Sequence, residues 1–306
     1  MTVAAPKATV ASLDATVAAS KTPAPKATAS TRESWGPLPR LRPARGAPSV
    51  LAIRTPLSRR ARVLLVTASV VAPIVAWLLL GVSGVVEPRY LPTPFEVWQA
   101  GVDLARNGQL ATDAWATVQR IVFGFGLAVL ASVPLGIAMG SFNAANALLE
   151  PVSGLLRYLP AAAFTPLLLI WLGIGEAPKV ALIFLGTFFF NMLMVADATR
   201  LVPIDLIAVS YTLGARRFEV LRKVIVPYAT PGIIDAVRVN FAAAWNLVVV
   251  AELVNSETGL GKRILLSQRF TQTDKIFAIL VVIAVIGVVT DVLLRILRQR
   301  IGRWVP

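Results

Sequence analysis

Long apolar segments separated by short polar ones dominate the chain from residue 63 onward. A helix needs about 20 apolar residues, at about 1.5 Å rise each, to cross a membrane. Six segments approach that length: 63–86, 121–140, 157–174, 180–196, 233–254 and 276–297. The third is short and contains Pro160 and Pro166, and the fifth is the most polar. The pattern predicts an all-α integral membrane protein with about six transmembrane helices, the first over 63–86.

Composition supports this assignment and excludes several kinds of chemistry. Hydrophobic residues make up 56% of the 306 residues and charged residues 15%, whereas soluble domains average about 45–50% and about 25%. The chain has no Cys and no His, which excludes disulfides, thiolate or imidazole catalysis and ordinary zinc sites. No G-x-x-x-x-G-K-[ST] nucleotide loop occurs. We therefore expect no catalytic residues, no metal and no cofactor bound by this chain.

The net charge of +14 is concentrated at the N-terminus. Residues 1–62 carry +9, and residues 1–30 are almost entirely Ala, Thr, Ser, Pro and Lys, which predicts a disordered basic tail. The basic surplus flanks apolar spans, so we expect no nucleic-acid partner. With the N-terminus inside, inner segments hold 21 Lys/Arg and outer segments 8. The positive-inside rule then predicts a multi-pass protein with both termini cytoplasmic.

The inner segment 198–230 is predicted to form a protruding helical hairpin. A helix over 204–213 would stop at Gly214, where the chain can adopt a positive φ. A second short amphipathic helix over 216–225 would follow. Two prolines would close it, Pro227 and Pro231. From the residues alone, the hairpin is either a docking element for another protein or a helix lying on anionic headgroups.

The spacing from Gly214 to Pro227, with Val224-Ile225-Val226 before the proline, resembles the cytoplasmic "EAA" loop of ABC-importer permeases. The downstream sequence YATPGIIDAVRVNFAAAWNLVVVAELV also resembles these permeases. The upstream sequence RYLPAAAFTPLLLIWLGIGEAPKVALIFLGTFF resembles specifically the nitrate/sulfonate/taurine/bicarbonate branch. The resemblance covers about 90–304 and implies the type I ABC importer permease fold. The loop's Glu-Ala-Ala is Ala208-Val209-Ser210 here, so a Glu-mediated ATPase contact does not carry over.

The resemblance also implies function and partners. The hairpin would bind an ATPase subunit through the coupling residues Gly214, Ala215, Arg216, Arg217, Phe218 and Pro227. ATP and Mg²⁺ would be bound by two cytoplasmic ATPases, and the other partners would be a second permease copy, an extracytoplasmic solute-binding protein and the lipid of a bacterial inner membrane. The cargo would be a small oxyanion or sulfonate such as taurine, nitrate or bicarbonate. The alternative is an ion-coupled secondary transporter, although the chain shows no internal hydropathy repeat.

Several polar side chains lie within the predicted spans. Arg238, Trp245 and Glu252 are seven residues apart and share one helical face, with Asn246 between them. These four and Asn191 are candidates for either a solute pathway or interhelical contacts.

Two further spacings predict helix contacts. Gly136 and Gly140 form a small-xxx-small step that allows close packing. Asp291 and Arg295 are four residues apart and are predicted to pair.

The charge distribution generates a topology prediction. Cys introduced at Ser210 or at Thr31 should resist an impermeant thiol reagent applied outside intact cells, because both positions are predicted to be cytoplasmic. Lys262→Cys, in the predicted outer segment, should react and serves as the positive control. Ready labelling at position 210 or 31 would contradict the six-span topology.

Overall fold

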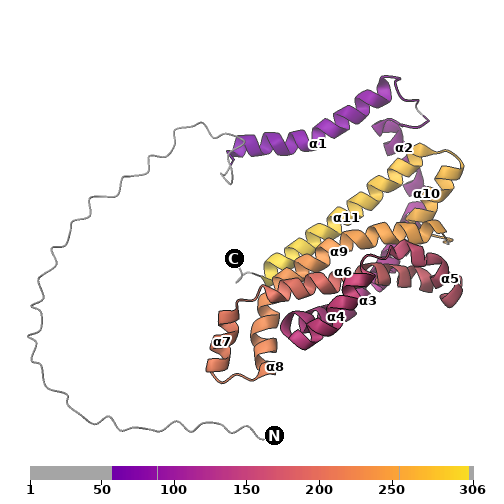
Figure 1. Cartoon of the computed structure of the whole chain (residues 1–306). Coiled ribbons are helices and arrows are strands. Elements are labelled where there is room, and N and C mark those ends of the chain that lie inside the picture. Colours follow the sequence, from indigo (N-terminus) through magenta and orange to yellow (C-terminus); the bar gives the residue numbers. More distant parts are fainter. Residues whose placement is uncertain (1–56, 88, 255, 303–306) are drawn as a thin grey trace, which may run out of the picture. The chain divides into compact units, whose positions relative to one another are not determined.

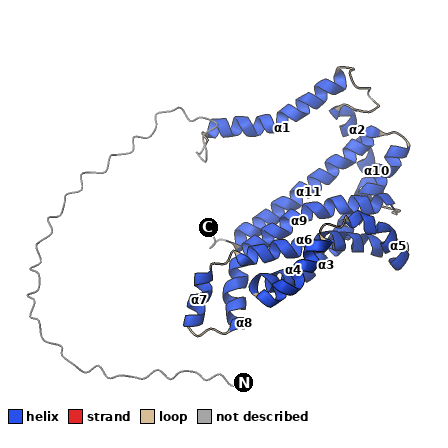
Figure 2. Ribbon diagram, viewed as in Figure 1, coloured by secondary structure: helices blue, strands red, loops and turns tan. Residues whose placement is uncertain are grey.

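The computed structural model describes residues 57–87, 89–254 and 256–302, and the regular structure of these residues is helical (Figures 1 and 2). The chain divides into two units, Met1–Val63 and Leu64–Pro306, and the second holds nearly all of the described helices. The predicted disordered tail over 1–30, like most of the basic segment 1–62, lies outside the described residues.

The helices occur in the order α1 (Arg59–Val82), α2 (Pro94–Arg106), α3 (Gln109–Ser141), α4 (Asn143–Leu156), η1 (Ala161–Phe164), α5 (Thr165–Leu172), α6 (Ala177–Arg200), α7 (Ile204–Thr212), α8 (Arg217–Val220), η2 (Leu221–Ile225), α9 (Val226–Val254), α10 (Leu260–Arg269) and α11 (Thr273–Ile301). Five continuous helical segments are long and apolar enough to cross a membrane, and the bent pair Asn143–Leu156 and Ala161–Leu172 is a candidate sixth crossing.

Helices α3 and α6 pack in parallel and unusually close together. A Cβ built on Gly124 would lie 2.7 Å from Cβ of Ile183, and one on Gly136 would lie 2.7 Å from Cβ of Val195. The same holds for Gly140, whose Cβ would lie 2.6 Å from Cβ of Thr199. Each pair is 59 residues apart, so the two helices run in the same direction in constant register. The predicted small-xxx-small contact of Gly136 and Gly140 is confirmed.

The parallel arrangement settles the role of the bent helix pair. Since α3 and α6 both start at the same end of the bundle, residues 142–176 must return across its full thickness. Asn146 of α4 accepts a hydrogen bond from Arg200, and Ala161 lies against Gly186. The segment that contains Asn146 and Ala161 thus runs antiparallel to α6. Helix α4, η1 and α5 together form one crossing, which bends by 81°. With this pair counted as one span, the described residues contain six candidate crossings.

The third crossing begins earlier than the sequence pattern predicts. We expected a span over 157–174, whereas helical structure starts at Asn143 and breaks between Leu156 and Ala161. Asn143, Asn146 and Glu150 lower the hydropathy of α4, which is why it resembles a loop in the apolar pattern. Pro160 lies at the break, because proline disfavours helical geometry in the residue before it.

Helix α9 packs antiparallel to α6, and α11 packs antiparallel to α9. Gly232 of α9 lies against Ala198, and Asn240 donates a hydrogen bond to Asn191 at 3.4 Å. Between α9 and α11, Asp235 and Arg298 pair at 3.0 Å. The start of α9 and the end of α11 therefore lie at the same end of the bundle as the end of α6. Because α7 and α8 connect α6 to α9, we call this the hairpin end.

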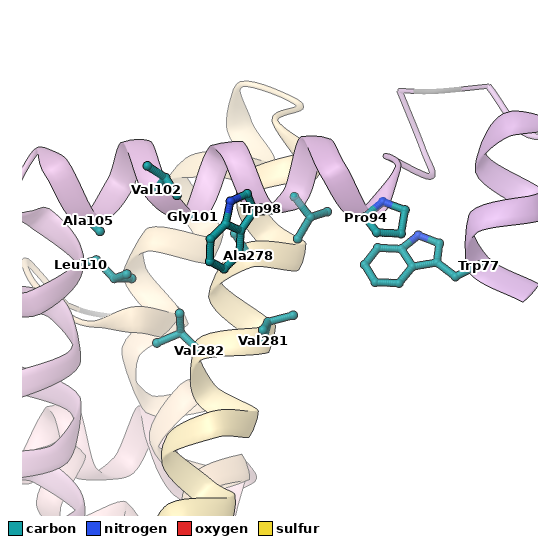
Figure 3. A pocket seen from close by; sticks show the side chains of 11 residues that line it. Trp77, Pro94, Trp98, Gly101, Val102, Ala105, Leu110, Ala278, Val281 and Val282 are labelled. Carbon is teal, nitrogen blue, oxygen red and sulfur yellow. The ribbon is translucent and has the colours of Figure 1, made fainter. Parts of the chain in front are cut away.

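An apolar cavity of about 390 Å³ lies between α2, the first turns of α11 and Trp77 of α1 (Figure 3). Trp98, Gly101 and Val281 contribute to its lining, and the described residues that line it carry no charge. Such a cavity offers no group that would bind an ion or a charged solute. The polar residues that matter for function lie elsewhere.

The close α3–α6 contact generates a stability prediction. Gly136→Ala should destabilise the protein by about 1–3 kcal/mol, because its Cβ would overlap the Met192 carbonyl and Val195. Gly126→Ala on the same helix is the matched control, since nothing lies within 4 Å of its Cβ. It should be neutral or stabilise by up to about 1 kcal/mol. Unfolding titrations in mixed detergent micelles measure both, and equal midpoints would contradict the close contact.

Candidate functional site

The first arm of the hairpin ends in a turn that requires glycine. Helix α7 stops after Thr212, and Gly214 has φ of +83°. The Gly214 N–H donates to the Tyr211 carbonyl at 2.9 Å and the Ala215 N–H to the Ser210 carbonyl at 3.0 Å. This pair of bonds is the Schellman motif, which satisfies the last carbonyls of a helix. The predicted positive φ at Gly214 is confirmed.

The second arm runs directly into α9. Helix α8 begins after Arg216, whose N–H donates to the Glu219 carboxylate at 3.0 Å, and continues through the π-helical turn η2. The expectation that Pro227 and Pro231 close this helix is wrong, because both lie within α9. In a regular α-helix, Pro227 would clash with the Lys223 carbonyl. The wider π turn over Leu221–Ile225 provides room for the proline ring.

The hairpin tip combines a notch with exposed apolar and cationic side chains. The notch has a volume of about 340 Å³ and is lined by Ser210, Leu213, Gly214, Ala215, Glu219, Val220, Lys223 and Val224. Leu213 is 81% exposed and Phe218 is 70% exposed, and Arg216 and Arg217 lie beside them in the chain. The structure therefore brings the predicted residues 214–218 together at one tip. Pro227 lies apart from them, in the first turn of α9.

Glu252 forms the centre of a polar cluster at the opposite end of the bundle. Its carboxylate is fully buried and accepts hydrogen bonds from Arg120 at 2.6 Å and from Thr117 at 2.8 Å. It also accepts one from the Gly261 N–H at 2.7 Å. Gly259, with φ of +124°, passes so close that a Cβ would lie 2.5 Å from the carboxyl carbon. The cluster thus connects α3, α9 and the segment that leads into α10.

Arg120 extends this cluster to the start of α6. Its guanidinium donates to Glu176 at 2.5 Å and to the Thr258 carbonyl at 2.7 Å. The Arg120 hydrogen bond, assisted by Lys179, lowers the pKa of Glu176 to about 2. Because this pKa is depressed, the contact stabilises the fold fully above about pH 4.5 and is lost only as the pH falls toward 2. It is intact at neutral pH.

A second charged pair belongs to the same end of the bundle. Arg263 of α10 pairs with Asp113 of α3 at 2.7 Å, and Asp113 also accepts the Gly259 N–H at 2.9 Å. Sequence reasoning missed Asp113, Thr117 and Arg120, because they precede the predicted span over 121–140. Their spacing of four and three residues places them on one helical face, which was the available signal.

Two of the other predicted polar residues, Arg238 and Asn191, contact neighbouring helices. Arg238 pairs with Asp291 at 2.5 Å, and Asp291 also pairs with Arg295 at 3.1 Å, which confirms the predicted pair. Arg238 and Trp245 line one cavity of about 290 Å³ between α9 and α11. Asn191 accepts from Asn240 at 3.4 Å.

Asn246 and Glu252, two further predicted polar residues, differ from Arg238 in how much of the side chain is exposed. Asn246 is exposed and donates to the Ala242 carbonyl of its own helix at 3.3 Å. Glu252 is fully buried in the cluster at the opposite end of α9. The structure thus brings Arg238 and Trp245 together and leaves Asn191, Asn246 and Glu252 at separate places.

Comparison with known proteins identifies the class. Residues 132–303 match the family described as "Binding-protein-dependent transport system inner membrane component". The match covers more than half of the chain, so this protein belongs to that family of ABC-importer permeases. It is a multi-pass transport subunit, and the membership favours the importer over an ion-coupled secondary transporter.

Its relatives and structural neighbours agree. The chain is 36% identical to the probable ABC transporter permease BMEII0107 of Brucella melitensis, over 74% of this chain and 92% of the relative. It is 33% identical to the putative aliphatic sulfonates transport permease SsuC of Bacillus subtilis (76% and 84%), and 32% identical to the taurine transport permease TauC of Escherichia coli (82% and 92%). An amino acid ABC transporter structure shares the fold, with a TM-score of 0.52 at 15% identity over 66% of this chain and 96% of that one.

The buried cluster generates the prediction for this site. Glu252→Ala should destabilise the protein by about 3 kcal/mol, because it leaves buried Arg120, Thr117 and the Gly261 N–H without their shared acceptor. Asn246→Ala on the same helix is the control and should change stability by less than about 0.5 kcal/mol. Unfolding midpoints in mixed micelles measure both. A Glu252→Ala midpoint equal to that of Asn246→Ala would show that the cluster contributes no stability.

Proposed function

We propose that this permease moves a small sulfonate or related oxyanion into the cytoplasm, and that its hairpin transmits ATP hydrolysis from a partner subunit to the membrane helices. In the proposed assembly, two copies of the chain form the pathway, each hairpin binds a cytoplasmic ATPase that holds ATP and Mg²⁺, and an extracytoplasmic binding protein delivers the cargo. The observation that carries the proposal is the exposed tip, residues 214–218, joined without a break to α9.

The composition of the tip favours a protein partner. Leu213 and Phe218 expose large apolar surfaces beside a notch, and an exposed aromatic side chain is a common interface anchor. Arg216 and Arg217 supply charge-assisted hydrogen bonds to acidic groups. Because the notch lies between two backbone segments, a protruding side chain of the partner has a defined place to bind. A flat amphipathic helix on headgroups would not need this notch.

The hairpin is mechanically suited to transmit force. Its second arm and α9 form one helical segment, Arg217–Val254, so a displacement of the tip acts directly on α9. The first arm is connected to α6 through the short segment 201–203. Since α6 and α9 both contact α3, movement of the hairpin would tilt or rotate the pair against the rest of the bundle. That motion is the physical basis of alternating access in this proposal.

The cargo class rests on the relatives. Two of them are named for sulfonates, aliphatic sulfonates in one case and taurine in the other. A sulfonate, nitrate or bicarbonate presents an anionic group with several oxygen acceptors, which a guanidinium binds well.

The Glu that gives the EAA loop its name is replaced by Ala208 in this chain. The proposal therefore assigns the ATPase contact to the residues of the hairpin tip.

Mutations at the tip test the coupling role. Gly214→Val should reduce ATPase co-purification, or ATPase stimulation by the binding protein, by about tenfold or more, because a β-branched residue is strained at φ of +83°. Ala215→Glu should have the same effect, because it adds bulk and a charge to the notch. Both variants should still insert into the membrane.

Gly126→Val is the matched control, because position 126 is open and lies on α3, away from the hairpin. Co-purification with a tagged permease and ATP hydrolysis in proteoliposomes are the measurements. If Gly214→Val and Ala215→Glu both retain full ATPase binding and stimulation, the hairpin is not the coupling element.

A further inference from the structure

The break in the third crossing lies near the middle of the membrane. Asn146 contacts Arg200 at the hairpin end of α6, and Ala161 lies against Gly186. Arg157 follows Asn146 by 11 residues, so it is about 16 Å further along the crossing, at about 1.5 Å per residue. Helix α6 has 24 residues and is about 36 Å long. Arg157 is therefore close to mid-depth.

The chain at this depth is not helical, and its residues are exposed. Residues 157–160 lie between the end of α4 and the start of η1, and all four are exposed. Tyr158 is 75% exposed and Leu159 is 48% exposed. The N–H groups of Arg157, Tyr158 and Leu159 donate to the carbonyls of Ser153, Leu155 and Leu156. Irregular backbone at membrane depth occurs within protein or along a water-filled cavity, so the exposed break favours such a position over one that faces lipid.

The charge of Arg157 points to water rather than to a dry protein contact. No carboxylate among the described residues lies within salt-bridge distance of its guanidinium, whereas Arg120 contacts Glu252 and Glu176. Arg238 contacts Asp235 and Asp291. Arg157 is instead placed 4.9 Å from the centre of the Tyr158 ring and donates to the Tyr158 hydroxyl at 3.0 Å. An exposed cation at mid-depth faces an aqueous cavity in the assembled protein, since lipid would not solvate it.

We infer that the segment 157–160 lines the solute pathway and that Arg157 binds the anionic group of the cargo midway through the membrane. The planar guanidinium matches the oxygens of a sulfonate or another oxyanion. The Tyr158 hydroxyl, which accepts one guanidinium N–H, limits its orientations. The inference rests on the proposed function for its cargo class and adds a binding residue to it. Arg157 lies on the third crossing and is not one of the polar candidates that the sequence predicted on α6 and α9.

The accessibility of the break can be tested without knowing the cargo. The natural chain has no Cys, so Leu159→Cys gives a single reactive thiol. Leu130→Cys is the matched control: Leu130 is 73% exposed, and the constant register of α3 against α6 places it at the level of residue 189, near mid-depth. In the complete transporter, with and without ATP, a water-soluble methanethiosulfonate should label the thiol at position 159 at least about tenfold faster than the thiol at position 130. Equal or slower labelling at position 159 would overturn the inference.

The role of the charge needs a second comparison. The Leu159→Cys variant is labelled with two methanethiosulfonates, one that carries a sulfonate and one that carries a trimethylammonium group. The labelling rate of the anionic reagent divided by that of the cationic reagent reports the local preference for anions. Adding Arg157→Gln should lower this ratio by about tenfold, because the local positive charge is removed. Arg157→Lys, which keeps the charge, should keep the ratio within about threefold of the starting value. Arg106→Gln, which removes a positive charge at the end of α2, should leave it unchanged.

These outcomes separate the inference from the proposed function. A ratio that Arg157→Gln does not change would overturn the binding role of Arg157, even if the ATPase still co-purifies with the permease. Taurine uptake adds a direct reading, and Arg157→Gln should reduce it by about tenfold while ATPase binding stays intact. Unchanged taurine uptake in this variant would likewise overturn the role.

Discussion

The close parallel contact of α3 and α6 determines much of the remaining architecture. Glycines at 124, 136 and 140 allow the α6 backbone and side chains to approach to distances that a Cβ would forbid. Because the two helices run in the same direction, the chain between them must cross the membrane again within residues 142–176. The third crossing and its break are therefore consequences of this contact, and α9 packs antiparallel to α6 beside it.

Helix α9 is held at both ends by different kinds of contact. At the hairpin end it is continuous with the arm that carries the exposed tip. At the opposite end its Glu252 accepts three buried hydrogen bonds from α3 and from the start of α10. Buried ionic contacts of this kind depend strongly on geometry. Movement of the hairpin is therefore resisted at the opposite end, where the Glu252 cluster connects α9 to α3 and α10.

Sequence patterning predicted the elements that depend on residues close together in the chain. The apolar runs located the spans, and the need for a positive φ located the turn at Gly214. The failures have one cause in common, which is that a neighbouring segment outweighs a local signal. Pro227 does not end a helix, because the π turn before it provides room for its ring. Helix α4 is polar enough to resemble a loop, yet the parallel α3–α6 pair requires it to cross. The Arg120 cluster joins residues 132 positions apart, and no short spacing reveals such a pair.

The treatment of arginine inside the bundle distinguishes structural from functional charge. Arg120 contacts Glu176 and Glu252, which fix it within the bundle. Arg238 is fixed between Asp235 and Asp291, which it shares with Arg298 and Arg295. Arg157 has an aromatic ring and a hydroxyl instead, which orient a guanidinium without neutralising it. A cation that is compensated within the protein has little affinity left for a passing anion, whereas an oriented and uncompensated one retains it. An anion pathway needs binding that is favourable enough for entry and weak enough for release. One partly hydrated arginine satisfies both conditions better than a cluster would.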